Sequence, residues 1–202
     1  MYDLHTHSLL SDGELLPVEL IRRAAVLGYT TLGITDHVDA SNISRVLESL
    51  MRVRDSARQY GVDLICGVEI THVPPVEIPA LARQAKQEGA GIVIVHGETT
   101  VEPVAPGTNM AACICADVDV LAHPGFITPE EAKEAAKRGI AIELTARCGH
   151  NRTNGHVMKV ARLTGCRLVV DSDAHAPGDL MDNKTRMIVG RGAGMTEEEC
   201  SV

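Results

Sequence analysis

The sequence predicts an α/β protein that folds as a closed parallel barrel, and two observations lead to this prediction. Short apolar runs alternate with amphipathic stretches along the 202 residues, which is typical of parallel strands joined by helical crossovers. Histidine and acidic residues follow nearly every apolar run. An open sheet gathers a site at one switch point, whereas a barrel brings residues from all strand ends to one mouth. We therefore expect a (β/α)7 barrel, one unit short of the eight-fold TIM barrel, in a single domain over residues 1–202.

Apolar runs bounded by turn residues mark the expected strands. Each run is short and nearly continuous, as the buried strands of parallel sheets are. The seven runs are Tyr2–His5, Thr31–Thr35, Leu64–Val68, Ile92–Val95, Val118–Ala122, Ile140–Leu144 and Arg167–Val170.

Helix signals lie between these runs. Pro17 begins the first helix and Gly28 ends it, which is the arrangement that helix ends favour. The segment Thr128-Pro129-Glu130-Glu131 is a capping box with proline at the first helical position, and Gly139 ends that helix. The other expected helices cover residues 41–60, 76–88, 109–116 and 153–163.

The glycine-rich segment 190–194 is expected to be a turn. Its spacing is similar to that of a dinucleotide-binding loop, but Met195 stands at the third glycine position and no βαβ unit comes after it.

Net charge and aromatic content indicate which kind of partner the chain can bind. The net charge of -8 gives the chain no excess of the basic residues that a long nucleic acid requires. With no Trp, one Phe and three Tyr, unpaired bases would find few rings on which to stack. If the protein binds phosphate, we therefore expect a small phosphorylated substrate rather than nucleic acid.

Cysteine use and hydropathy bear on the compartment. The six cysteines form no C-x-x-C pair, so they are expected to be reduced and mostly buried thiols. No apolar run approaches the roughly 20 residues that span a bilayer. His5 lies where a cleavable presequence would have to be. We expect a cytoplasmic protein with no membrane partner.

Nine residues are of metal-ligand type, and nearly every one of them lies where an expected strand ends. Each of them alone would more simply be a hydrogen-bonded residue at a strand end, but so many at successive strand ends are improbable without a shared role. Imidazole nitrogen and carboxylate oxygen together suit zinc, manganese or iron, whereas calcium and magnesium prefer oxygen alone. We expect two or three divalent transition metals (Zn, Mn or Fe) bound by His5, His7, Asp12, His37, Glu69, His96, His123, Asp173 and His175.

Two of these motifs are expected to face each other. His5-Thr6-His7 places two imidazoles on one side of an extended segment, because strand side chains alternate. Asp173-Ala174-His175 repeats this spacing after the last strand, and in a closed barrel the last strand lies beside the first.

The ordered motifs resemble those of the PHP (polymerase and histidinol phosphatase) superfamily over about residues 2–178. The matching motifs are His5-x-His7 with Ser11-Asp12-Gly13, Thr35-Asp36-His37, Gly67-Val68-Glu69, Val95-His96-Gly97, Ala122-His123-Pro124 and Ser172-Asp173-Ala174-His175. The chain is most similar to the small stand-alone histidinol-phosphatase-like phosphoesterases. This resemblance implies a distorted (β/α)7 TIM-like barrel that holds a trinuclear metal site.

The resemblance also implies how the ligands are shared. Glu69 would bridge two ions and so act directly in catalysis. The first shell would be His5, His7, Glu69 and Asp173, the second Glu69, His96 and His123, and the third Asp12, His37 and His175.

A multinuclear site of this kind favours hydrolysis at phosphorus. Two divalent ions about 3.5–4 Å apart can activate water and clamp both the attacking and the leaving oxygen. We expect a metal-dependent phosphatase that hydrolyses a phosphomonoester of a small metabolite, such as histidinol phosphate or a nucleotide monophosphate. Two alternatives stay open: a phosphodiesterase or exonuclease that uses the same metals, and a non-catalytic PHP interaction module.

The loop after the sixth strand is the expected phosphate-binding segment. Arg147 and Arg152 carry planar guanidinium groups that match phosphate oxygens, although solvated loop charges are the alternative. His150 is a candidate for substrate binding and for protonating the leaving oxygen, and Glu98 is a second candidate for that protonation.

Two further expectations concern the surroundings of the ligands. Asp36 could fix the imidazole of His37 in one tautomer, although solvation is equally plausible. The loop over residues 99–108 is expected to form a rim over the site.

Overall fold

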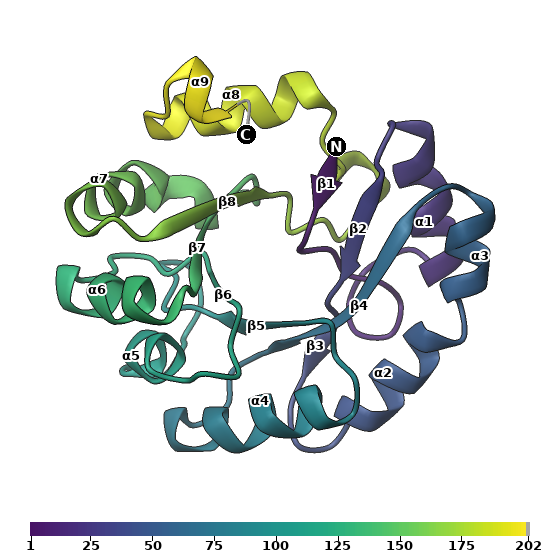
Figure 1. Cartoon of the computed structure of the whole chain (residues 1–202), viewed down its shortest axis with the longest axis horizontal. Helices are drawn as coiled ribbons and strands as arrows, with labels where there is room; N and C mark the ends of the chain where they lie inside the picture. Colours follow the sequence, from purple (N-terminus) through teal and green to yellow (C-terminus); the bar gives the residue numbers. More distant parts are fainter. Residues whose placement is uncertain (201–202) are drawn as a thin grey trace.

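The computed structural model describes residues 1–200, and its strands form a curved parallel sheet with the helices packed outside it (Figure 1). The order is β1-β2-β4-β5-β6-β7-β8, and the neighbours in this path are parallel. The bounds are β1 (Tyr2–Asp3), β2 (Thr31–Ile34), β3 (His37–Val38), β4 (Asp63–Ile70), β5 (Ile92–His96), β6 (Val120–Ala122), β7 (Ala141–Thr145) and β8 (Arg167–Asp171). The predicted α/β barrel is confirmed. Residues 201 and 202 of the predicted 1–202 domain lie outside the described residues.

One strand position is interrupted. Ile34 at the end of β2 pairs with Cys66, and His37 at the start of β3 pairs with Glu69, so both short strands run along β4. Within residues 1–200 the barrel therefore has seven strand positions, as the sequence predicts.

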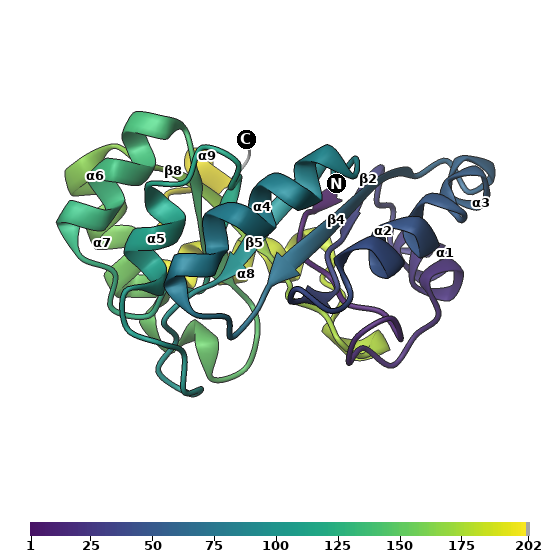
Figure 2. The same ribbon diagram turned by 90° about the horizontal axis from the view of Figure 1, so that it is seen from below.

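Helices cover the outer face of the sheet, with α4 lying between the group α1–α3 and the group α5–α7 (Figure 2). In the first half they are α1 (Pro17–Val26), α2 (Ile43–Met51), α3 (Arg54–Gln59), η1 (Pro75–Glu77) and α4 (Ile78–Gln87). In the second half they are α5 (Thr108–Cys113), α6 (Pro129–Arg138), η2 (His150–Thr153), α7 (Asn154–Thr164), η3 (Pro177–Asp179), α8 (Asn183–Ala193) and α9 (Glu197–Cys200). Of these helices, none is both long enough and apolar enough to cross a bilayer.

The expected helix over residues 41–60 is two helices. A turn at Arg52 and Val53 separates α2 from α3. Ala57 in α3 is still buried, so the apolar period continues across the turn, and periodicity alone could not reveal the break.

The expected turn at residues 190–194 is also wrong, because this segment is the end of α8. Asp182 caps the start of the helix, and its carboxylate accepts a hydrogen bond from the Thr185 N–H at 2.7 Å. Gly194 ends the helix in the left-handed conformation that glycine favours.

The predicted start of α6 is confirmed, since Thr128 and Glu131 form the reciprocal hydrogen bonds of a capping box.

Alternate strand residues fill the barrel interior, and this decides where the polar strand ends point. Ile92 and Ile94 of β5 pack with Val120 and Ala141 of the next two strands in one buried cluster. His96 comes after Ile94 on the same face of β5, because strand side chains alternate. The row of apolar side chains that β5 points into the barrel therefore ends in the imidazole of His96.

The barrel closes between β8 and β1 without a regular ladder. Within residues 1–200, one parallel bridge between Thr6 and Ala174 joins the two sides, with the His7 N–H donating to the Ala174 carbonyl at 2.8 Å. Helix α8 packs against β7 and β8 beside this seam (Figure 1).

Buried carboxylates complete the seam. Asp171 Oδ1 accepts a hydrogen bond from the Leu4 N–H at 2.8 Å, and Asp3 Oδ1 accepts one from the Ser172 N–H at 3.3 Å. Burial raises the pKa of both carboxyl groups, that of Asp3 to about 6. Side chains thus replace part of the backbone pairing at the point where the first and last strands bring their ligands together.

The cysteines contribute to packing and form no cross-link among the described residues. All six are free thiols, and Cys66, Cys113, Cys115 and Cys166 are buried. The prediction that most of these thiols are buried is confirmed.

Candidate metal centre

The nine predicted ligands meet at the C-terminal ends of the strands. Glu69 continues the column of Ile65 and Gly67 on the interior face of β4. A side chain at position 67 would collide with Ile92 of β5, so glycine there lets the two strands approach and brings Glu69 into the centre of the mouth.

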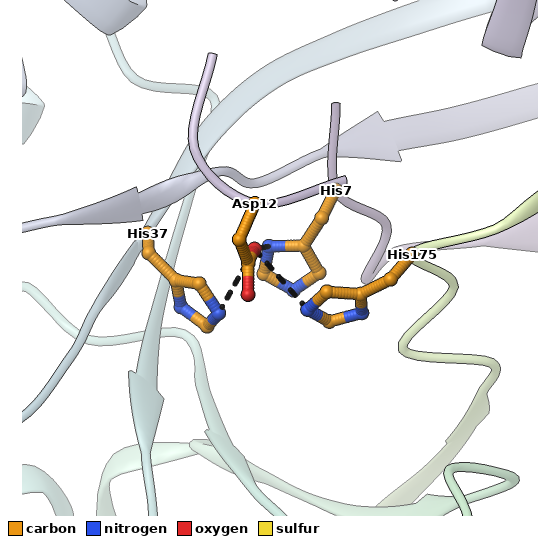
Figure 3. A group of neighbouring side chains, drawn as sticks. All are labelled: His7, Asp12, His37 and His175. Atoms are coloured by element: carbon orange, nitrogen blue, oxygen red, sulfur yellow. Dashed lines mark ion pairs between the residues drawn. The ribbon is translucent and has the colours of Figure 1, made fainter. Parts of the chain in front are cut away.

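Four side chains converge at the outer edge of the cluster (Figure 3). Asp12 Oδ1 lies 3.4 Å from His37 Nε2 and 3.3 Å from His175 Nε2. One ligand atom from each of Asp12, His37, His175 and His7 falls within 4.8 Å of the others. This group contains the whole third shell that the family resemblance implies.

Asp36 holds the loop that carries Asp12. Its Oδ1 accepts hydrogen bonds from the Ser8 N–H at 2.8 Å and from the Ser11 hydroxyl at 2.7 Å. The expectation that Asp36 fixes the tautomer of His37 is therefore wrong: Thr71 Oγ1, at 2.7 Å, and Glu69 stand beside His37 Nδ1 instead.

Glu69 is fully buried at the centre of the cluster. Its Oε2 lies 2.7 Å from His37 Nδ1 and 3.4 Å from His5 Nε2, and its Oε1 lies 3.6 Å from His123 Nε2. Neither oxygen has a well-formed hydrogen bond within residues 1–200. A buried carboxylate in this condition requires a cation, and its two oxygens point to different groups of imidazoles.

Asp173 closes the cluster from the last strand. Its Oδ1 lies 3.2 Å from His7 Nε2 and 3.7 Å from His5 Nε2, and its Oδ2 lies 3.5 Å from His123 Nε2. Because His5 and His7 also lie beside Glu69, the members of the first implied shell are all within reach of one another.

The second implied shell is assembled differently. His96 and His123 offer nitrogen atoms close to one another and to His150, a group that the resemblance does not include. Glu69 reaches this group through His123.

Several imidazoles have one nitrogen already engaged in a hydrogen bond. His96 Nδ1 and His175 Nδ1 donate to the backbone carbonyls of Gly97 and Asp173 at 3.1 and 3.0 Å. Since a carbonyl can only accept, the neutral form of each ring presents its Nε2 lone pair to the cluster. Metal-binding histidines typically have this arrangement, so the donor set fits divalent transition metals.

Two of the buried rings are held in the neutral form that binds metals. Burial, with help from neighbouring imidazoles, holds the pKa of His7 and of His123 well below the usual value, which favours the neutral form that binds metals. Burial alone would raise the pKa of Glu69, but His5 and His37 outweigh it and hold that pKa well below its usual range. Burial raises the pKa of Asp173 to about 7.

Backbone strain concentrates at this mouth. Within residues 1–200 the non-glycine residues with positive φ are His72 (55°), His123 (25°) and Asp173 (51°). Such conformations are unfavourable for L-residues and cluster at functional sites. Here His123 and Asp173 are predicted ligands, and the His72 ring lies 5.0 Å from that of His96.

A cleft of about 380 Å³ opens over the ligands, and we call it the metal cleft. Besides five predicted ligands, it is lined by Arg147, His150, Glu102, His72 and residues of the loop after β3. Arg147 is held by Asp179, with Nη1 3.4 Å from Oδ2.

The other predicted substrate residues are placed differently. Arg152 is exposed in η2 and does not line the metal cleft. Glu98 Oε1 accepts hydrogen bonds from the N–H groups of Gly107 and Asn109 at 2.9 and 3.0 Å, and it does not line the cleft either. This placement gives no support to the expectation that Glu98 protonates the leaving oxygen.

Sequence reasoning missed three residues of the site. Glu143 in β7 is fully buried, with Oε1 2.9 Å from His5 Nδ1 and Oε2 accepting from the His123 N–H at 2.9 Å. Its only sequence signal is an acidic residue inside an apolar strand. Glu102 and His72 lie in irregular segments, where no helix or strand periodicity of the sequence could have identified them.

Comparison with known proteins identifies the family. The PHP domain model matches residues 3–161. The chain belongs to the PHP domain family. Asp173 and His175 lie beyond the matched residues, yet the fold returns them to the same mouth. Family membership and the candidate ligands together support the predicted class, a metal-dependent phosphoesterase.

Relatives differ in how much of the chain they cover. An uncharacterized protein of Methanocaldococcus jannaschii is 48% identical over 200 residues, covering 98% of this chain and 92% of that protein. A 5'-3' exoribonuclease of Haemophilus influenzae is 40% identical over 70 residues, 35% of this chain and 23% of the relative. A 3',5'-nucleoside bisphosphate phosphatase of Chromobacterium violaceum is 38% identical over 69 residues, 34% of this chain and 22% of the relative.

Solved structures support the fold. A chain of an archaeal ribonuclease P with mature tRNA aligns with a TM-score of 0.68 at 16% identity, covering 98% of this chain and 90% of that one. A two-domain protein of Bacteroides vulgatus containing a predicted PHP-like metal-dependent phosphoesterase aligns with a TM-score of 0.57 at 20% identity, covering 87% and 52%. At these identities the likeness concerns the fold alone.

The position of Glu143 generates a prediction. Glu143→Gln should weaken metal binding by about 10- to 100-fold, because the amide loses the charge that orients His5 and makes its other nitrogen a better donor. Competition of the protein with a chromogenic chelator measures this affinity. The exposed Glu130→Gln in α6 is the control, and unchanged affinity in Glu143→Gln would show that His5 needs no such support.

Proposed function

We propose that this chain hydrolyses a phosphomonoester of a small metabolite at a multinuclear metal site. The observation that carries the proposal is that Arg147 and five of the predicted metal ligands line one small cleft. A terminal phosphate is a dianion with three oxygens, and such a group can bind a guanidinium fork and several cations together.

The chain's own residues prepare the phosphate site. Asp179 Oδ2 lies 3.4 Å from Arg147 Nη1 and also accepts a hydrogen bond from the His175 N–H at 3.0 Å. This carboxylate therefore positions the arginine relative to a ligand of the third shell. When bound, divalent metals would supply Lewis acidity and a nucleophile drawn from water at neutral pH.

His150 is the residue we propose for protonating the leaving oxygen. Its Nε2 lies 3.3 Å from Glu102 Oε1, and its buried Nδ1 has no hydrogen-bond partner within residues 1–200. His150 lines the metal cleft, and in the imidazolium form the ring carries a proton that can pass to a leaving oxygen. Burial lowers the pKa of His150, which makes that form a stronger acid.

The organic part of the substrate has space beside the phosphate. A second cavity of about 620 Å³ shares Arg147, His150 and Glu102 with the metal cleft. The two volumes are typical of sites for small molecules. This size, the net charge of -8 and the low aromatic content favour a metabolite over a polynucleotide. A cytoplasmic location remains part of this proposal.

A nuclease is the second candidate, and the relatives favour keeping it. The exoribonuclease of Haemophilus influenzae shares 40% identity with a third of this chain. The metals proposed here could also serve a diester.

The reaction class generates a prediction. With zinc, manganese or iron restored, the protein should hydrolyse p-nitrophenyl phosphate at least roughly tenfold faster than bis-p-nitrophenyl phosphate, because the diester loses one charge-assisted contact. Parallel rates on both esters and on a short oligonucleotide measure this. Faster cleavage of the diester or the oligonucleotide would establish the nuclease instead, and absence of any hydrolysis with all three metals would favour a non-catalytic module.

Arg147 generates a second prediction. Arg147→Ala should raise KM for a monoester roughly tenfold or more, since it removes a charged hydrogen bond to the phosphate, and it should leave the metal content unchanged. Arg152→Ala is the matched comparison, with a smaller effect expected because the side chain is exposed outside the cleft. Equal rises in KM for the two variants would support the expectation that both Arg147 and Arg152 bind the phosphate. A loss of metal in Arg147→Ala would instead assign Arg147 to structural support of the metal centre.

A further inference from the structure

Glu102 extends from the loop between β5 and α5 into the ligand cluster. Its Oε2 lies 3.0 Å from His72 Nε2 and 3.1 Å from His96 Nε2, and its Oε1 lies 3.3 Å from His150 Nε2. Neither Glu102 nor His72 belongs to the ligand shells that the family motifs imply. One carboxylate thus contacts three imidazoles at the outer side of the cluster.

The tautomer of His96 indicates what lies between these groups. Because His96 Nδ1 donates to the Gly97 carbonyl, the neutral ring has no proton left for Glu102, and a lone pair faces a carboxylate oxygen. A nitrogen lone pair and a carboxylate oxygen repel each other at this distance unless a cation lies between them. Either a second proton on His96 or a metal ion can supply that charge.

His72 gives an independent reason to choose the metal ion. This residue sits in the left-handed region with φ of 55°, although it is not glycine. The strained backbone aims its imidazole at Glu102, and its ring centroid lies 5.0 Å from that of His96. One ligand atom from each of His72, His96 and Glu102 falls within 4.8 Å of the others, and two imidazoles with one carboxylate are a common shell for zinc.

We propose that the ion held by His96 is also bound by His72 and Glu102 on the outer side of the cluster, through two Nε2 atoms and one carboxylate oxygen. Since the one free lone pair of His96 can bind one ion only, this is the ion that the family resemblance assigns to His96 and not an additional one. The site extends the metal cluster on which the proposed function rests, but its occupancy can be measured without any substrate. It also has a structural consequence. Glu102 belongs to the loop over residues 97–107, so the bound ion ties this loop to His72 beyond the end of β4.

Metal binding to the full-length protein tests the site. Metal-free protein is titrated with Co²⁺, monitored by visible absorption and by calorimetry, for the wild type, Glu102→Gln and His72→Asn. Asparagine tolerates the left-handed backbone, so His72→Asn removes the imidazole without adding strain. Both variants should weaken binding of one equivalent by at least about tenfold and alter the absorption bands. Glu19→Gln, which removes an exposed carboxylate of α1, is the control and should bind as the wild type does.

Loop protection gives a second readout. Hydrogen exchange of residues 99–107 should slow when Co²⁺ is added to the wild type, and this change should be lost in Glu102→Gln. Unchanged or tighter Co²⁺ binding in Glu102→Gln would overturn the proposal, because it would show that the carboxylate only pairs with an imidazolium. Since turnover is not used, this outcome would leave the monoester assay to decide the function separately.

Discussion

A buried carboxylate among imidazoles is the constraint on which the rest of this structure depends. Glu69 is fully buried, and neither of its oxygens has a well-formed hydrogen bond within residues 1–200. Removing such a charge from water costs several kcal/mol unless an opposite charge compensates. His5 and His37 compensate this charge in part, but His7 and His123 are held neutral by burial and by neighbouring imidazoles. Bound cations are the compensation that also satisfies the lone pairs of those rings.

The barrel is the device that assembles this cluster. Parallel strands end at one mouth, and side-chain alternation places every second residue inside. The least regular part of the barrel is the seam between β8 and β1. This seam carries His5, His7, Asp173 and His175. Buried Asp3 and Asp171 hold that seam through backbone N–H groups of the opposite strand. The irregular closure therefore allows the ligand segments of the two ends to lie side by side, and the strained φ of Asp173 is part of the same arrangement.

Features that depend on strand ends could be predicted from the sequence, whereas contacts made only by the folded barrel could not. Strand positions and the nine candidate ligands are recognisable because most apolar runs end in His, Asp or Glu, and the ends of parallel strands meet at one mouth. Glu143 could not be recognised, since its partners His5 and His123 are joined to it only by the barrel. Glu102 and His72 could not be recognised either, because they lie in loops, where the sequence shows no helix or strand periodicity. Asp36 stands next to His37 in sequence but turns to the Ser8–Ser11 loop, because side chains of adjacent residues in an extended segment point to opposite sides.

Metal content is the most direct measure of whether the mouth is a metal centre. Purified protein would be reconstituted separately with zinc, manganese and iron, freed of loose metal, and analysed by mass spectrometry beside Glu69→Gln. We predict about two or three tightly held equivalents per chain in the wild type and the loss of at least one in Glu69→Gln, because a bridging carboxylate serves two ions. Fewer than about one equivalent in the wild type with each of the three metals would contradict the existence of the centre.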